Sequence, residues 1–363
     1  MATTPRTSKK STAKKATTPK RANPPRSSVR FFDKESNTDQ ISRLLDAKNL
    51  VPERLRGTDK YLDIVCWNVR WFDAADPDRV AAITDVLAAL NADCLVLTEV
   101  ADDGALDQVV ADLAARKAGF YSIHYGSKGG QQRVVMLWDR DWVRAKAPLG
   151  ELFDDEHLSV PSEIGNGRQA VFPRLPVWGY FEARSESDEG FNFELVGLHL
   201  KAQGPAPRGY SGPEKRWGVA QRTRAALRLA QWLVEEEEHL DADVIVVGDW
   251  NANVGEKEWA PLLDVESQGS IAFESINRDT EISHMVRLNK GGPAGSRIDL
   301  VLVTNEAQAN AVSDQVGVVV QWSLFDHLDA LDGDERQELF KQLKQKFSDH
   351  LPVVSRFYLG LGS

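Results

Sequence analysis

Two short polar segments bring together side chains that could carry out acid–base and metal chemistry. Gly248-Asp249-Trp250-Asn251 follows the apolar run 244–247, and Ser348-Asp349-His350-Leu351-Pro352 precedes the apolar run 353–357. Carboxylate and carboxamide oxygens are hard ligands that suit Mg²⁺, and imidazole is the usual proton carrier near neutral pH. Together these groups indicate metal-assisted attack of water on a phosphate ester.

Apolar runs beside these polar side chains predict buried strands, and the ends of strands hold side chains rigidly at the edge of a cleft. Four more segments repeat this arrangement, each with a polar side chain near one end of a predicted strand. They are 63–68 ending in Asn68, 94–99 ending in Glu99, 195–201 with His199 and Lys201, and 296–303 with Asp299. The sequence therefore predicts a site built from several strand ends.

The proton-transfer groups come from three of these segments. His350 is the expected general base, and Asp299 would accept the hydrogen of its other ring nitrogen and stabilise the imidazolium. Asp249 and Asn251 are two residues apart on an extended segment, so both side chains point to one side. We expect one of them to polarise the attacking water while the other holds a phosphate oxygen.

Candidate ligands for a metal and for phosphate lie both in these segments and outside them. Glu99 is the expected metal ligand, because a buried carboxylate without a partner is costly, and Asp349 would lie on the metal side. Lys201 points to the same side as His199 and is a phosphate-binding candidate, as is Arg174, whose guanidinium fork matches phosphate geometry. Two further arginines could bind phosphate, although solvated arginines would look the same: Arg133 and Arg168.

The ordered set of segments resembles the endonuclease/exonuclease/phosphatase superfamily, the DNase I-like fold, and its motif pattern is closest to DNase I-like metal-dependent nucleases. The resemblance covers residues 61–359. It implies an α+β (α/β) fold, a four-layer sandwich in which helices flank two mixed β-sheets. It also implies a metal-dependent phosphoesterase that uses Mg²⁺, for which Mn²⁺ can substitute.

The same resemblance suggests roles for three residues. Asn68 would join Glu99 at the metal, and Arg174 matches the family's Arg-x-Pro strand entry. His199 matches the second active-site imidazole of DNase I-like nucleases, where it would donate to a phosphate oxygen or to the leaving oxygen. Abasic-site nucleases of the superfamily have a tyrosine there, so His199 favours the DNase I or sphingomyelinase side.

Three positions depart from the family's pattern. Thr98 stands where Gln usually precedes the glutamate, which puts in doubt a hydrogen bond to that ligand. Trp250 replaces the usual Phe, and Arg70 occupies a position where some relatives carry an acid, so this loop supplies no additional acidic ligand. None of the expected catalytic residues is missing.

The remaining five histidines match no motif and are expected at the surface or in the core: His124, His157, His239, His284 and His327.

The composition fits a globular protein. A chain of 363 residues with 42% hydrophobic and 27% charged residues can form one large domain or two ordinary ones, and the resemblance favours one. No apolar run approaches the ~20 residues that span a bilayer, and the N-terminus lacks the apolar core of a signal peptide. We therefore expect a cytoplasmic protein without a transmembrane segment, in which Cys66 and Cys94 are free buried thiols.

Charge is divided unevenly along the chain. Residues 1–30 contain nine Lys or Arg and no acid, so they contribute +9 to a chain of net charge −10 and leave −19 on the remainder. This segment lacks apolar periodicity and is expected to be a disordered basic tail, followed by a lead-in segment, 31–60, and a catalytic domain, 61–359. A basic arm of this kind can grip nucleic acid through its phosphates, although it could also be a solubilising or targeting tail.

Periodicity predicts helices that begin near residues 77, 104, 213 and 333, separated by many strands. The segment 256–295 has no clear pattern, and no element is assigned to most of it. The alternation of strands with few long helices agrees with two packed sheets flanked by helices.

These observations favour a Mg²⁺-dependent endonuclease that cuts DNA. The alternative is a phosphatase or phosphodiesterase that acts on a small phosphorylated molecule or a phospholipid, such as an inositol phosphate, a nucleotide or sphingomyelin. A third hypothesis, a non-enzymatic binding module on this fold, would require a missing catalytic residue.

Overall fold

The computed structural model describes residues 43–46, 50–160, 167–184, 190–204, 210, 217–235, 239–267, 269–272 and 280–359. The predicted basic tail and the first part of the lead-in segment lie outside the described residues, so the structure does not bear on the predicted arm.

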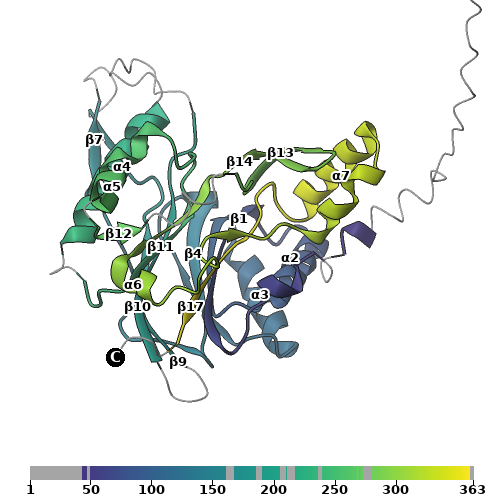
Figure 1. The fold of residues 1–363 in the computed structure, drawn as a ribbon, viewed down its shortest axis with the longest axis horizontal. Helices are drawn as coiled ribbons and strands as arrows, with labels where there is room; N and C mark the ends of the chain where they lie inside the picture. The colour runs from purple at the N-terminus through teal and green to yellow at the C-terminus, as the bar shows by residue number, and fades with distance from the viewer. Residues whose placement is uncertain are drawn as a thin grey trace, which may run out of the picture. The chain divides into compact units, whose positions relative to one another are not determined.

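Two mixed β-sheets form the centre of the domain (Figure 1). Within the described residues the first sheet has six strands, in the order β16 (Val318–Val319), β17 (Val353–Tyr358), β1 (Tyr61–Phe72), β2 (Cys94–Val100), β4 (Arg133–Asp139) and β3 (Tyr121–Tyr125). The second has seven, in the order β12 (Ile271–Ala272), β15 (Asp299–Thr304), β11 (Val244–Asp249), β10 (Gly190–His199), β9 (Val177–Arg184) and β5 (Val143–Ala145), with β6 (Gly150–Glu151) paired to β9.

Each sheet contains one parallel pair of strands at its centre. These are β1 with β2 and β10 with β11, while the flanking pairs are antiparallel. Parallel neighbours present their carboxyl ends at the same edge of a sheet. The ends of these four strands carry most of the predicted site residues, and β15 and β17, which run the other way, begin at the same edge.

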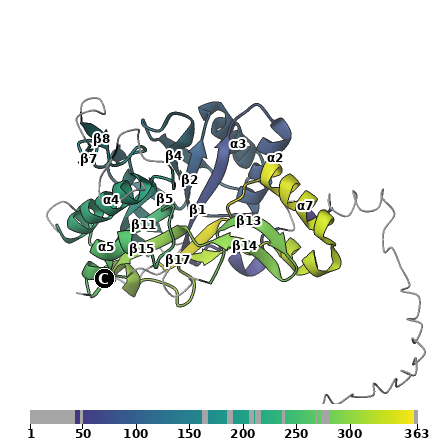
Figure 2. The same ribbon diagram turned by 90° about the horizontal axis from the view of Figure 1, so that it is seen from above.

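Helices cover the outer faces of the two sheets, as Figures 1 and 2 show. The first sheet is covered by α2 (Pro77–Leu90), α3 (Asp103–Ala115) and α7 (Gly333–Lys346), and the second by α4 (Trp217–Val234) and α5 (Ala260–Ser267). The short α6 (Asn305–Ala309) follows β15. The predicted four-layer arrangement of two mixed sheets flanked by helices is therefore confirmed.

Alternate residues of the second sheet face different layers, as the period of a strand requires. Ile245 and Val247 belong to the core between the sheets, whereas Val244 and Val246 pack beneath α4 and α5. The sheets approach closely at Gly197, where an added Cβ would lie 2.6 Å from a methyl carbon of Val96. Fully apolar runs such as 244–247 are thus explained by burial on both faces.

Local capping agrees with the sequence. Asp76 caps α2 by accepting hydrogen bonds from the backbone N–H groups of Asp78 and Arg79, both at 3.1 Å, with Pro77 in the first turn. A capping box between Asp332 and Glu335 begins α7.

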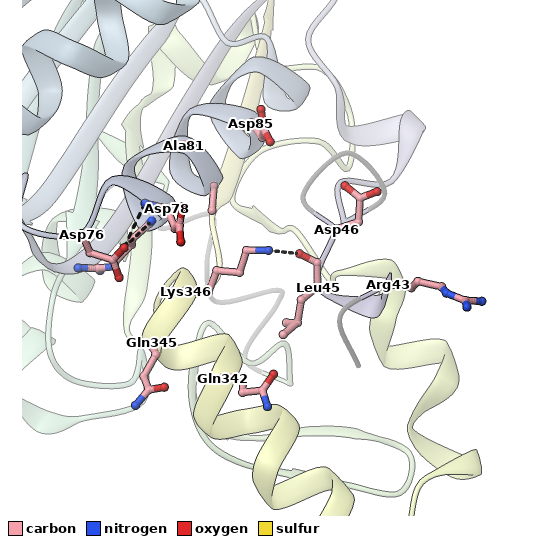
Figure 3. Close-up of a pocket in the computed structure, with 12 residues that line it drawn as sticks. Arg43, Leu45, Asp46, Asp76, Asp78, Ala81, Asp85, Gln342, Gln345 and Lys346 are labelled. Atoms are coloured by element: carbon pink, nitrogen blue, oxygen red, sulfur yellow. Dashed lines mark hydrogen bonds between the residues drawn. The ribbon is translucent and has the colours of Figure 1, made fainter. Parts of the chain in front are cut away.

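The described part of the lead-in segment packs against the domain. Leu45, Leu50 and Val51 are buried in the same core as the first sheet. A cavity of about 810 Å³ separates this segment from α2 and α7, and Lys346 donates to the carbonyl of Leu45 at 2.9 Å across it (Figure 3). None of the predicted site residues lines this cavity.

The structure contains elements that the sequence did not indicate. One is a hairpin, β13 (His284–Asn289) with β14 (Gly292–Ser296), inside the segment that had no clear pattern. Another is the short pair β7 (His157–Ser159) and β8 (Arg168–Ala170).

Cys66 and Cys94 are buried free thiols, as predicted. No helix of the described residues has the length and apolar character needed to cross a membrane.

Candidate active site

The register of the second sheet places three predicted residues side by side. His199 pairs with Asp249 across β10 and β11, and Asp249 pairs with Asp299 across β11 and β15. Opposite residues on neighbouring strands have their Cβ atoms about 4.5–5.5 Å apart. All three side chains are buried, so they form one compact polar group inside the fold.

A glycine allows β11 to end in this way. Gly248 has φ +145°, and an added Cβ would lie 2.0 Å from the carbonyl oxygen of Leu198 on β10. Any side chain here would separate the two strands or turn Asp249 away. The glycine of the Gly-Asp-Trp-Asn segment is therefore part of what positions the carboxylate.

The first sheet contributes Asn68 from β1 and Glu99 from β2. Both strands are irregular at this edge, with register shifts after Asn68 and after Leu97 and with Glu99 at φ +61°. The Nδ2 of Asn68 donates to Oε1 of Glu99 at 3.2 Å and to Oδ2 of Asp249 at 2.9 Å. One amide group thus connects the strand ends of the two sheets.

His350 pairs with Asp299, as expected. Its Nδ1 lies 2.8 Å from Oδ2 of Asp299. Burial alone would lower the pKa of His350, but the charges of Asp299 and Asp249 and the hydrogen bond to Asp299 raise it to about 10. The contact with Asp299 therefore favours the protonated form of His350.

Asp249 lies at the centre of the site. Burial, together with the charge of Asp299, raises the pKa of Asp249 to about 7. The backbone N–H of Asn251 donates to its Oδ1 at 2.9 Å. Ligand atoms of Asp249, Asp299 and His350 all lie within 4.8 Å of one another. A carboxylate with a pKa near neutrality can accept a proton at physiological pH.

Asn251 is the second polar residue of its segment, and its side chain has a partner in the protein. Its Nδ2 donates to the carbonyl of Leu200 at 3.0 Å, and its backbone has φ +59°. This hydrogen bond fixes the turn after β11. The predicted contact of Asn251 with a phosphate oxygen stays a prediction.

Arg174 and His199 form a second pair on the other side of Asp249. Nη2 of Arg174 lies 2.9 Å from Nε2 of His199 and donates to Gln132 at 3.0 Å. Arginine can only donate, so Nε2 of His199 accepts, and the imidazole is neutral with its hydrogen on Nδ1. Burial, with Arg174 beside it, lowers the pKa of His199 well below its usual range. In this arrangement His199 holds Arg174, which presents the positive charge.

The neutral state of His199 bears on its expected role. Its Nε2 lies 3.6 Å from Oδ2 of Asp249, but that nitrogen carries no hydrogen while Arg174 donates to it. A direct donation from His199 to a phosphate or leaving oxygen stays a prediction, whereas the structure brings Arg174 to the site. Lys201 follows on the same segment, half-buried, and its pKa is lowered by burial and by Arg174.

Asp349 lies beside the site but faces two cations. Its Oδ2 is 2.5 Å from Nζ of Lys344 on α7, and its Oδ1 is 3.6 Å from Nε of Arg70. Burial would raise its pKa, but Lys344 and His350 lower it. Its predicted place on the metal side would require this carboxylate to leave one of these ion pairs.

Two arginines considered from sequence lie on other elements. Arg133, at the start of β4, forms an ion pair with Asp103 and stacks over Tyr125, with 5.5 Å from its guanidinium carbon to the ring centroid. Arg168 is exposed on β8. Phosphate binding by either arginine stays a prediction.

Sequence reasoning missed His284, which was expected at the surface or in the core. Its ring centroid lies 4.6 Å from that of His350, and the two residues form a backbone bridge. Met285 donates its backbone N–H to Asp349 at 2.7 Å, and Ser283 accepts from the N–H of Asp299 at 3.0 Å. The base of the β13–β14 hairpin therefore supports the loop that carries His350.

The donor set fits a hard divalent cation. Glu99 and Asp249 lie on either side of Nδ2 of Asn68, so two carboxylates offer oxygen ligands at one place, while Oδ1 of Asn68 accepts from the N–H of Arg70 at 2.9 Å. Asp299 and His350 already bind one another at 2.8 Å. Glu99 is therefore the residue that would hold a metal, with Asp249 next to it, and Asn68 would join through its Oδ1 only if its amide turned over.

Residues 65–350 match the model of the Endonuclease/Exonuclease/phosphatase family. The chain belongs to this family. Its members are hydrolytic phosphoesterases, so the protein is a hydrolase of the DNase I-like fold. A search of curated proteins found no match.

Several solved structures are similar to this family member. Humanised D. rerio TDP2 is 16% identical, with 83% of this chain and 99% of that chain covered and a TM-score of 0.48. The human nocturnin catalytic domain with bound sulfate is 15% identical, covering 82% and 94% with a TM-score of 0.48. A mannosyl-6-phosphatase of Bacteroides thetaiotaomicron is 16% identical, covering 81% and 98% with a TM-score of 0.47.

Proposed function

We propose that this protein is a Mg²⁺-dependent phosphodiesterase that cuts DNA internally by in-line attack of an activated water. One observation carries the proposal. A ligand atom of Asp249 lies within 4.8 Å of those of Asp299 and His350, and on its other side Oδ2 of Asp249 is 3.6 Å from Nε2 of His199, which accepts from Arg174. A proton acceptor flanked by two positive charges suits attack on a phosphodiester.

The residues divide the work as follows. Asp249 accepts a proton from water as the water oxygen attacks phosphorus. The P–O bond to the leaving oxygen breaks, and that oxygen takes up a proton from solvent. The imidazolium of His350, held by Asp299, and the guanidinium of Arg174 offset the negative charge that develops on the phosphate. Lys201 and Asn251 bind phosphate oxygens.

This division differs from the sequence-based expectation for His350. The role of His350 as general base stays a prediction. Because the charges of Asp299 and Asp249 raise the pKa of His350, we propose Asp249 as the proton acceptor and the His350–Asp299 pair as the group that stabilises charge. A Mg²⁺ ion held by Glu99 and Asn68, or Mn²⁺ in its place, would supply further neutralisation of the phosphate.

The choice of DNA rests on charge. The nine positive charges of residues 1–30 would contact several phosphates of a polymer. The second candidate substrate is a small phosphorylated molecule or a phospholipid, and the charge of −19 on the rest of the chain favours it, since that charge repels a polyanion. A cytoplasmic location remains a prediction.

A substrate panel tests the proposal. The purified full chain is incubated with supercoiled plasmid, single-stranded DNA, RNA, an inositol phosphate and sphingomyelin vesicles, each with Mg²⁺, Mn²⁺ or EDTA. Asp249→Asn protein, purified identically, controls for contaminating nucleases. We expect nicked and then linear plasmid with either metal and none with EDTA. Hydrolysis of only the small or lipid substrates would reject DNA cleavage and support the second candidate.

A further inference from the structure

We infer that Trp71 binds the substrate by stacking against a nucleobase next to the scissile phosphate. The inference rests on the proposed function, because it specifies how a nucleic acid would be held at the same site. It assigns a specificity-determining role to a residue that no motif includes.

The backbone at Trp71 is unusual for such a large residue. Arg70 and Trp71 have φ +47° and +48°, in the left-handed region. Bulky residues avoid this region because of steric strain, and such strain persists where the surroundings enforce it, often at functional sites. Two consecutive residues of this kind make a sharp turn within β1.

A buried arginine holds the turn in place. The guanidinium of Arg79 donates to three consecutive carbonyls, those of Val69 at 2.5 Å, Arg70 at 2.6 Å and Trp71 at 3.2 Å. It also donates to the carbonyl of Phe347 at 3.0 Å, just before the segment with His350. The turn is therefore fixed to the loop that carries the catalytic imidazole.

The turn lies at the rim of the active site. Trp71 is three residues from Asn68, so their Cα atoms are at most about 11 Å apart. The N–H of Arg70 donates to Oδ1 of Asn68 at 2.9 Å, and the Arg70 side chain pairs with Asp349. Trp71 is nevertheless 47% exposed. Within the described residues its indole has no hydrogen bond or ring contact.

An exposed indole on a rigid turn beside a phosphate site suits a flat π system. Aromatic side chains bind nucleic acids by stacking on bases, and this is tolerant of sequence because every base has a π face. The turn also borders a cavity of about 560 Å³ lined by Arg70, Phe340, Lys341 and Lys344, together with Asp334 and Glu338. Two cations of this lining, Arg70 and Lys344, pair with Asp349 at the edge of the active site. A neighbouring nucleotide can be accommodated there.

The test compares normal and abasic DNA. One oligonucleotide is intact, and a second has abasic residues on both sides of the scissile phosphate. We expect the unchanged protein to cut the intact one with a kcat/KM about 5- to 150-fold higher, which corresponds to the ~1–3 kcal/mol of one stacked base. Trp71→Ala should lower kcat/KM on intact DNA by that same factor. On abasic DNA its loss of kcat/KM should be several-fold smaller. Trp71→Phe, which keeps a ring, should lose less than Trp71→Ala.

Phe120→Ala is the matched control. Phe120 is also an exposed aromatic, 38% exposed, but it precedes β3 at the edge opposite the site, where Tyr121 pairs with Asp139. It should leave both rates unchanged. Equal rates on intact and abasic DNA, or equal losses for Trp71→Ala on both, would overturn the inference and leave DNA cleavage intact. No cleavage of any nucleic acid by the unchanged protein would overturn both.

Discussion

At the scale of single residues, charge states decide which groups can transfer a proton. Asp299 and His350 form an ion pair that keeps the imidazole protonated, and the same Asp299 charge holds a proton more tightly on Asp249. The proposed mechanism therefore requires Asp249 without its proton and His350 with its proton. The rate should depend on pH through both of them.

The first prediction concerns this pH dependence. Asp249 must be deprotonated, so kcat/KM should rise as pH increases through about 7. A bound divalent cation favours the carboxylate, so this rise should then occur at a lower pH. His350 must be protonated, so the rate should fall as pH rises through about 10. Asp299→Asn removes the anion that raises both pKa values, and both limbs should move to lower pH. Profiles that superimpose for the two proteins would show that Asp299 does not set these charges.

The second prediction concerns the metal ligand. Glu99→Gln keeps the size of the side chain and its contact with Asn68 but removes the negative charge. We expect at least ~100-fold lower activity at a fixed Mg²⁺ concentration, since even residues behind the ligands are worth about 10–100-fold. The measurement is a Mg²⁺ titration of the cleavage rate, with the exposed Glu53→Gln as a control. Unchanged Mg²⁺ dependence of Glu99→Gln would exclude it as a ligand.

The sequence predicted which residues lie close together better than it predicted their protonation states. Strand ends and the order of the motifs predict where side chains lie. The structure accordingly brings together five of the predicted residues: Asn68, Glu99, Asp249, Asp299 and His350. The neutral His199 that accepts from Arg174 could not be predicted, since that depends on a contact between β10 and a distant loop. His284 was missed for the same reason, because its contact with His350 exists only once the hairpin has formed.

Among the secondary-structure elements, the central strands were predicted from apolar runs and the helices from the spacing of apolar residues. The Val-Ile-Val-Val run 244–247 became β11, the predicted strand 296–303 became β15 from Asp299 onward, and α2 begins at Pro77, where a helix start was predicted. The β13–β14 hairpin was not predicted, because β14 reads Gly-Pro-Ala-Gly-Ser, residues of low strand propensity. Its strands form through pairing with each other and with the His350 loop, which no local pattern encodes.

The third prediction concerns the strand end that carries Asp249. Gly248→Ala places a Cβ against the carbonyl of Leu198 at a backbone angle that alanine avoids. We expect it to destabilise the protein by about 1–3 kcal/mol and to reduce activity by displacing the carboxylate. Gly255→Ala is the matched control, because a Cβ there meets no atom within 4 Å. Urea unfolding and cleavage rates of both variants provide the test, and equal behaviour of the two would refute the positional role of Gly248.

At the scale of the whole molecule, the contrast between a +9 segment and a −19 remainder governs encounter with a polyanion. The remainder repels DNA at long range, whereas the first 30 residues attract it. Affinity and chemistry are therefore expected to reside in different parts of the chain.

The fourth prediction is that removal of residues 1–30 weakens DNA binding and leaves turnover at saturating DNA nearly unchanged. The slope of log affinity against log salt should become shallower by about 0.9 for each phosphate that the truncated protein no longer neutralises. Fluorescence anisotropy of full-length and truncated proteins across a salt series measures both quantities. Identical affinities and slopes would show that the segment does not bind DNA and would strengthen the small-substrate candidate.

Plasmid cleavage by the unchanged protein, Asp249→Ala and His350→Ala, each with Mg²⁺, shows whether these two residues act on the phosphodiester. Groups that transfer or stabilise charge in the transition state are worth about 10²–10⁴-fold. We expect a loss of at least ~100-fold in each variant, with thermal unfolding that still shows a cooperatively folded protein, and no cleavage by any of the three in EDTA. Near-normal rates in either variant would remove that residue from the proposed mechanism, and full activity in EDTA would exclude a metal-dependent reaction.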